Sequence, residues 1–121
     1  MIGIGIDIVE LDRFRLALSR RGKMSGRLFT ERERANLARR SDPLPGLAAR
    51  FAAKEAAMKA LGVGLGAFDF ADVEVVGLAS GAPVLEVSGR AAEVAARLGV
   101  SSWHVSLSHS DGSAVAVVVA R

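Results

Sequence analysis

Two carboxylates of this chain stand among mainly apolar residues. Asp7 follows alternating glycines and isoleucines, and Glu55 lies in an alanine-rich stretch on a face that it shares with Phe51 and Met58. A carboxylate on an apolar face is costly unless a cation, a metal or a proton neutralises it. Because the chain has no Cys, the pair predicts a site of oxygen ligands, which suits a hard cation such as Mg²⁺.

Basic and imidazole side chains add to this chemistry. Lys54 and Lys59 belong to the same stretch as Glu55 and could reach the phosphates of a substrate, and His109 stands in a predicted turn between two apolar runs. Spacing alone leaves simpler roles open. Asp7 could cap a strand end, Glu55 could pair with Lys59 one helical turn away, and His109 could bond to a carbonyl.

Two elements must position the carboxylates. Residues 2–9 alternate strictly and predict a strand whose isoleucines face the core, while its glycines allow close approach by a ligand or another backbone. Residues 45–61 predict a long helix that Gly62 ends. The loop that follows contains Gly62 and Gly64; it is either a flexible helix exit or a set of backbone amides that meet a phosphate.

The remaining residues predict an α+β fold, an antiparallel sheet with helices packed on it. Residues 10–27 read as a helix or a helix plus loop. Thr30 and Glu33 form a capping box before a short helix that runs to about Arg40. Residues 72–77 and 83–88 predict a hairpin joined through residues 78–82, Ser88 caps a helix over 89–98, and residues 103–108 and 114–120 form two strands around a turn.

Composition narrows the class of protein. One hundred and twenty-one residues, 50% of them hydrophobic, suit a single domain spanning residues 1–121. The absence of Cys, of a secretory signal and of any apolar run of about 18 residues predicts a cytoplasmic protein without a membrane span.

The positive charge is concentrated in the first half of the chain. Residues 1–50 hold eleven of the sixteen Lys and Arg against six acidic residues. Arg13, Arg20 and Arg27 recur at a spacing of seven. This stripe is either a solvated face or a docking surface for an acidic partner.

Three motifs in order resemble a known family. They are Gly3-Ile4-Gly5-Ile6-Asp7-Ile8-Val9-Glu10, then Arg50-Phe51-Ala52-Ala53-Lys54-Glu55-Ala56 with Lys59-Ala60-Leu61-Gly62, and Val105-Ser106-Leu107-Ser108-His109-Ser110. Together they resemble the holo-[acyl-carrier-protein] synthases, the small bacterial 4′-phosphopantetheinyl transferases, over the whole chain.

The resemblance implies transfer of 4′-phosphopantetheine from coenzyme A to a serine of apo-acyl carrier protein, a step of fatty acid biosynthesis, with release of adenosine 3′,5′-bisphosphate. It implies Asp7 and Glu55 as ligands of Mg²⁺, with Lys59 as a third catalytic residue. It further implies a homotrimer with active sites between subunits, and a basic first helix (Arg13, Arg20 and Arg27) that docks the carrier. For coenzyme A it implies contacts from Arg50, Lys54, Lys59, Gly62, Gly64, Ser108 and His109. The base that takes the serine proton is left open between a metal-bound water and Glu55.

One segment departs from the family pattern. Residues 41–49 replace the usual lead into the central helix, and the basic residues stand earlier, at Arg39 and Arg40, which leaves Arg50 as the expected contact to the 3′-phosphate. A non-catalytic RNA-binding domain is the alternative from another class. It is disfavoured because the basic half offers only Phe14 and Phe29 for base stacking and leaves Glu55 unexplained.

Overall fold

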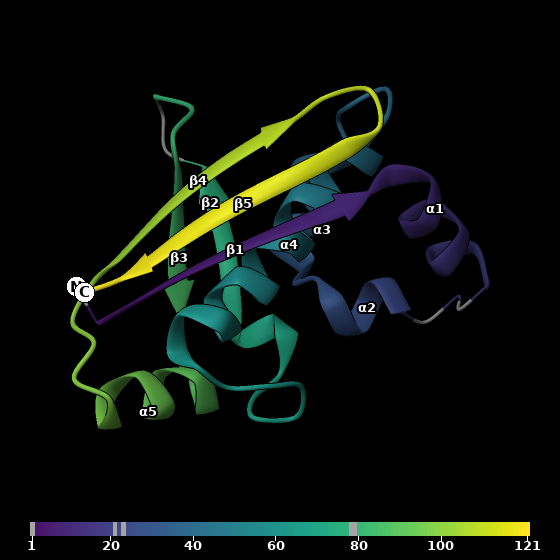
Figure 1. The fold of residues 1–121 in the computed structure, drawn as a ribbon. Coiled ribbons are helices and arrows are strands. Elements are labelled where there is room, and N and C mark those ends of the chain that lie inside the picture. The colour runs from purple at the N-terminus through teal and green to yellow at the C-terminus, as the bar shows by residue number, and fades with distance from the viewer. Residues whose placement is uncertain (1, 21, 23, 78–79) are drawn as a thin grey trace.

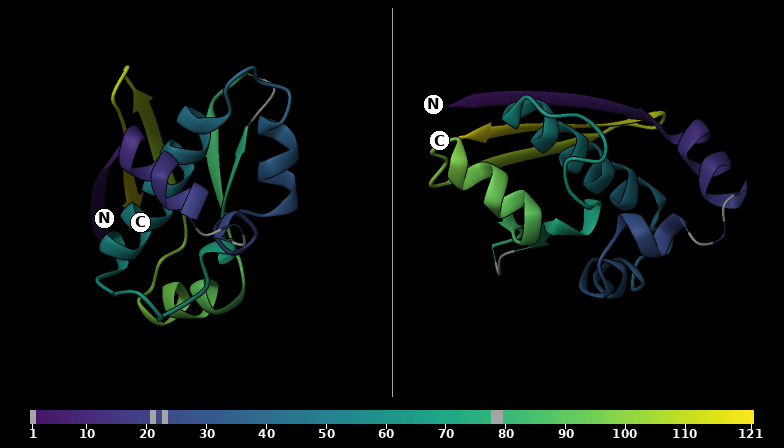
Figure 2. Two further views of the ribbon diagram at one scale, coloured as in Figure 1. Left: turned by 90° about the vertical axis from the view of Figure 1, so that its right-hand side faces the viewer. Right: turned by 90° about the horizontal axis from the view of Figure 1, so that it is seen from below.

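A computed structural model describes residues 2–20, 22, 24–77 and 80–121 of the chain. Three antiparallel strands form a sheet in the order β1 (Gly3–Glu10), β5 (Ser113–Ala120) and β4 (Trp103–His109). A second antiparallel pair consists of β2 (Val73–Gly77) and β3 (Pro83–Val87). The long helix α4 (Leu44–Leu61) lies against one face of the three-stranded sheet (Figures 1 and 2). The predicted α+β class is therefore confirmed.

Helix α4 is the centre of the core. It is buried on nearly every side, including a run of alanines that are almost fully inaccessible: Ala48, Ala49, Ala52, Ala53, Ala56, Ala57 and Ala60. Small side chains allow the sheet, α1 (Leu11–Arg20) and β2 to approach this helix closely. Gly62 ends the helix in a left-handed conformation with φ of 71°, as predicted.

The orientation of β1 differs from the sequence expectation. Its isoleucines were expected to face the core, yet Ile4, Ile6 and Ile8 are exposed, the last at 67%. The glycine face packs on α4 instead, because a Cβ at Gly5 would lie 1.9 Å from the carbonyl oxygen of Ala56. Alternation correctly predicted the strand, but its apolar side is the one that α4 does not cover.

The connecting elements follow the predictions with small corrections. The basic segment, expected as a helix or a helix plus loop, forms two helices, α1 and α2 (Met24–Leu28), so Arg27 lies on a different helix from Arg13 and Arg20. The capping box of Thr30 and Glu33 is present, but α3 (Glu31–Leu37) ends earlier than expected. Ser88 occupies the N-cap of α5 (Gly89–Arg97) without a side-chain bond; Asp72, in the short 3₁₀ turn Phe70–Asp72, accepts from the amide of Ala91 instead.

The hairpin of β2 and β3 and the strands β4 and β5 match the predicted segments. Leu78 and Ala79, which belong to the predicted hairpin loop, lie outside the described residues. His109 is the last residue of β4 rather than part of the turn that follows. Within the described part of the chain, no helix combines the length and apolarity needed to cross a membrane.

Candidate active site

The two predicted carboxylates come together where β1 crosses α4. The glycine face of β1 carries Asp7 toward the helix, and both Asp7 and Glu55 line one open cavity of about 500 Å³. Lys59, one turn after Glu55 on α4, donates from Nζ to the Asp7 carboxylate at 3.1 Å and to the carbonyl oxygen of Ile6 at 3.0 Å. The strand and the helix therefore position an acidic pair with an ammonium group at its edge.

The acidic pair is electrostatically strained. Burial raises the pKa of Glu55, the negative charge of Asp7 raises it further, and Lys59 opposes both effects. Two carboxylates that repel each other in a partly buried site are what a divalent cation stabilises. Among the described residues there is no cluster of three or more potential metal ligands. The two carboxylates nevertheless suit a cation such as Mg²⁺, because Mg²⁺ commonly takes one or two protein carboxylates together with substrate phosphates.

The same cavity has an apolar wall and a basic rim. Phe14 of α1 and Phe51 of α4 line it, with ring centroids 5.3 Å apart. Arg13, at the mouth, is exposed and lies 3.7 Å from the Glu10 carboxylate. The arrangement can accept a molecule that joins an anionic group to a less polar chain.

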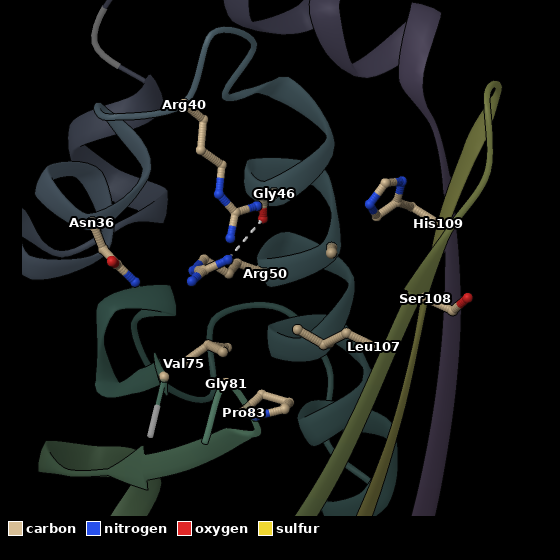
Figure 3. A pocket seen from close by; sticks show the side chains of 12 residues that line it. Asn36, Arg40, Gly46, Arg50, Val75, Gly81, Pro83, Leu107, Ser108 and His109 are labelled. Atoms are coloured by element: carbon tan, nitrogen blue, oxygen red, sulfur yellow. Dashed lines mark hydrogen bonds between the residues drawn. The ribbon is translucent and has the colours of Figure 1, made fainter. Parts of the chain in front are cut away.

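A second cavity of about 550 Å³ opens at the other edge of the sheet, beside β4 (Figure 3). Asn36, Arg40, Arg50 and His109 contribute its polar side chains. Arg50 is only 6% exposed; its Nη1 donates to the carbonyl oxygen of Gly46 at 3.4 Å, and its Nε has no hydrogen-bond partner among the described residues. A buried cation with an unsatisfied donor is a strong anion-binding feature.

No acidic side chain lines this second cavity among the described residues. Burial lowers the pKa of Arg50, Glu33 opposes that shift, and the neighbouring Arg40 adds to it. Arginine nonetheless keeps its proton in proteins, so two guanidinium groups face one hollow. Gly46 makes room for this, because a Cβ there would lie 2.9 Å from Nη1 of Arg40. Phosphate is the natural ligand for such a pair.

Ser108 and His109 point to opposite sides of β4, as consecutive strand residues must. The imidazole of His109 points toward the arginines, while the hydroxyl of Ser108 points away from the cavity (Figure 3). His109 pairs in register with Ala114, and Ser108 with Val115. Within one chain, Ser108 therefore offers its side chain to the outer face of the sheet, the side that also carries Ile8.

Lys54 does not lie in either cavity, and the expectation that it reaches a phosphate is corrected here. Its side chain is fully buried, and Nζ donates to Glu33 at 2.8 Å and to the carbonyl oxygens of Phe70 at 3.0 Å and Val73 at 2.6 Å. Glu33 in turn accepts from the amides of Thr30 and Val75. Lys54 thus ties α4 to α3 and β2, immediately beside the residue that faces Asp7.

The other predicted residues lie apart from the acidic pair. Gly62 and Gly64 are exposed beyond the C-terminal end of α4 and line neither cavity. Arg13 and Arg20 are exposed on α1, whereas Arg27 is on α2 and lines a different hollow with Phe68 and Asp69. The structure therefore brings together Asp7, Glu55 and Lys59 in one group, and Arg50 and His109 in another. Of the residues that the structure describes, none lines both cavities.

Sequence reasoning did not assign a ligand role to Asn36 or Arg40. Their only signal was indirect, the position of basic residues ahead of the unusual segment 41–49. The fold brings them opposite Arg50 because α3 and the start of α4 form a helical hairpin around Pro43.

Comparison with known proteins identifies the family. The sequence profile of the 4′-phosphopantetheinyl transferase superfamily matches residues 3–118. The chain belongs to that superfamily.

Relatives of this transferase agree along their whole length. It is 54% identical to the holo-[acyl-carrier-protein] synthase of Streptomyces avermitilis, over all of this chain and 98% of the relative. The crystal structure of the Neisseria meningitidis synthase superposes with a TM-score of 0.91 at 33% identity, covering 100% and 98% of the two chains. The Helicobacter pylori synthase, solved in complex with coenzyme A, superposes with a TM-score of 0.83 at 33% identity, covering 98% and 99%.

Proposed function

We propose that this transferase is a cytoplasmic holo-[acyl-carrier-protein] synthase, a single domain that moves 4′-phosphopantetheine from coenzyme A to a serine of apo-acyl carrier protein. The serine hydroxyl loses its proton, with Glu55 or a water as the candidate base, and its oxygen bonds to the phosphorus that carries the pantetheine arm. The bond from that phosphorus to the leaving adenosine 3′,5′-bisphosphate breaks. The observation that carries the proposal is the acidic pair of Asp7 and Glu55 beside Lys59, in a chain of this family.

We infer that Asp7 and Glu55 hold Mg²⁺, which would offset negative charge on the diphosphate as the bond breaks. Phosphoryl transfer places charge on the phosphate oxygens, and cationic side chains held nearby stabilise it. Lys59 is the ammonium group closest to the acidic pair and is proposed to bind the diphosphate. The apolar wall of Phe14 and Phe51 suits the pantetheine arm.

Arg50 and His109, together with Arg40, are proposed to bind the phosphates of the adenosine end. Support comes from the unsatisfied Nε of Arg50 and from the convergence of these side chains on one hollow. Gly62 and Gly64 stay candidates for backbone contact to a phosphate. Ser108 stays a candidate as well, although its side chain faces away from this hollow.

The separation of the two cavities favours an active site shared between chains. The acidic pair lies at the β1 edge of the sheet and the arginines at the β4 edge, and one chain does not join them. Uncovered isoleucines on β1 offer a surface that another subunit could bury. We therefore propose a homotrimer in which one subunit supplies Asp7 and Glu55 and a neighbour supplies Arg50 and His109.

Docking of the carrier is assigned to α1. Arg13 and Arg20 are exposed one above the other on this helix, with the exposed Leu16 between them. A basic helix with an apolar centre complements an acidic helix of a carrier. Arg27 lies on the separate helix α2, so it extends the basic surface rather than continuing the stripe.

The function is tested by incubating the full chain with coenzyme A, Mg²⁺ and an apo-acyl carrier protein, and weighing the carrier by mass spectrometry. We expect a gain equal to one phosphopantetheine group. A carrier of unchanged mass, together with salt-sensitive binding of RNA by the same chain, would favour the RNA-binding alternative.

A further inference from the structure

The ammonium group of Lys59 lies where it would repel a metal ion bound to Asp7. Its Nζ lies 3.1 Å from Oδ1 of Asp7, and Lys59 forms no second ion pair with a described residue. A second contact, to the carbonyl oxygen of Ile6 at 3.0 Å, fixes the ammonium on the strand that carries Asp7. A divalent cation bound to Asp7 and Glu55 would therefore have a positive charge as a close neighbour.

Lys59 is also able to leave. Its side chain is 55% exposed, against 19% for that of Asp7, and a lysine stem has four rotatable bonds. An exposed ion pair of this kind contributes little free energy, so an incoming phosphate can compete for the ammonium. Lys59 can thus exchange a carboxylate partner for an anionic ligand without unfolding α4.

We propose that Lys59 is a built-in competitor of the divalent cation: in the free enzyme it neutralises Asp7, and a diphosphate substrate draws it away and so opens the carboxylate to the metal. This inference rests on the proposed function, since it concerns the same acidic pair. Lys59 then has two successive partners, first Asp7 and then the substrate diphosphate, and the metal binds weakly until substrate arrives.

The test measures the affinity of the free full-length enzyme for Mn²⁺ in the absence of coenzyme A. The electron paramagnetic resonance signal of the unbound ion reports how much Mn²⁺ is bound. Lys59→Gln is expected to bind Mn²⁺ about two- to fivefold more tightly than the wild type, as loss of an exposed ion pair implies. The same variant should bind coenzyme A more weakly, measured by calorimetry. Damage to the fold would weaken the binding of both Mn²⁺ and coenzyme A. Tighter Mn²⁺ binding together with weaker coenzyme A binding therefore separates competition from a structural role.

Two controls complete the design. Arg13→Gln removes a positive charge from the same cavity, but Arg13 lies beside Glu10 rather than Asp7, so Mn²⁺ affinity should change by less than about twofold. Asp7→Asn should abolish Mn²⁺ binding, which locates the ion at the acidic pair.

Mn²⁺ affinity that is equal or weaker in Lys59→Gln, or that rises equally in Arg13→Gln, would overturn the inference. So would absence of specific Mn²⁺ binding in both the wild type and Lys59→Gln. The proposed function fails by a different result, an unchanged carrier mass in the transfer assay, so the two failures are distinguishable.

Discussion

At the scale of single residues, burial separates two lysines that the sequence places five positions apart. Lys54 and Lys59 lie on one helix, and both were candidates for phosphate contact. Lys54 is buried against Glu33, and Lys59 is exposed beside Asp7. Sequence alone could not distinguish them, because the partner that buries Lys54 comes from α3, 21 residues earlier. The alanine-rich surroundings of Glu55 predicted only that this carboxylate needs a neutralising partner, and the family resemblance added its pairing with Asp7.

Arg50 provides a prediction at this scale. Replacing it with Met keeps the apolar bulk that packs on α4 and removes the guanidinium that faces the second cavity. Because a hydrogen bond to a charged group contributes about 1.5–3 kcal/mol, the KM for coenzyme A should rise by roughly tenfold or more. The KM for the carrier should change little.

Steady-state kinetics with each substrate varied in turn measures both constants. Arg34→Met is the matched control, because Arg34 is an exposed arginine of α3 that does not line this cavity. Equal rises in the two constants for Arg50→Met would remove the assignment of Arg50 to coenzyme A.

At the scale of elements, the contact of β1 with α4 sets the spacing of Asp7 from Glu55. The contact depends on glycine, because a Cβ at Gly3 would lie 1.8 Å from the carbonyl oxygen of Ala60. The sequence predicted both elements and a close approach at the glycines, but the prediction that the isoleucines face the core was wrong. Isoleucines are the more apolar side, yet only the glycine side lets the backbone reach the helix. Tertiary packing decides this, and local pattern does not.

Gly5→Ala tests this contact. The added methyl group must push β1 away from α4, which should cost about 1–3 kcal/mol of unfolding free energy and lower the transfer rate by displacing Asp7. Gly26→Ala is the control: nothing lies near its Cβ position in α2, and alanine in a helix is favoured by about 0.5–1 kcal/mol. Urea unfolding measures the stability of both variants, and the transfer assay measures their rates. Wild-type stability and rate in Gly5→Ala would contradict the packing account.

Helix α1 carries the docking prediction. Charge reversal of Arg13 and Arg20 to Glu should raise the KM for the carrier by about tenfold, because like charges would then face an acidic partner helix. The KM for coenzyme A should stay near the wild-type value. Rising salt should narrow the difference in carrier KM between the variant and the wild type. Kinetics at two ionic strengths checks this. Parallel effects on both substrates would locate the arginines in the coenzyme A site instead.

At the scale of the whole molecule, the proposed trimer would bring together side chains that lie apart within one chain. The two candidate cavities lie at opposite edges of one sheet, and the apolar face of β1 is uncovered. The sequence suggested an oligomer through the family resemblance alone. It could not indicate that the two sets of site residues separate within a chain, because that depends on the position of α4 across the sheet.

Mixing two impaired variants tests a shared site. At a coenzyme A concentration below the wild-type KM, Glu55→Gln and Arg50→Met should each transfer poorly alone, because each removes one half of every site. When they are unfolded and refolded together, mixed trimers should regain activity, since a Glu55 from one subunit can then meet an Arg50 from another. The rate of carrier mass gain measures the recovery. No recovery, with mixed trimers shown by native mass spectrometry, would place both halves within one chain.

Asp7 and Glu55 are proposed to carry the transfer chemistry. The most direct test is the transfer rate of Asp7→Asn and Glu55→Gln at saturating coenzyme A, carrier and Mg²⁺. Both variants should keep the wild-type fold by circular dichroism and lose about 10²-fold or more in rate, because they remove the ligands that hold the charge-stabilising cation. Wild-type turnover in either folded variant, at limiting as well as saturating Mg²⁺, would contradict the account.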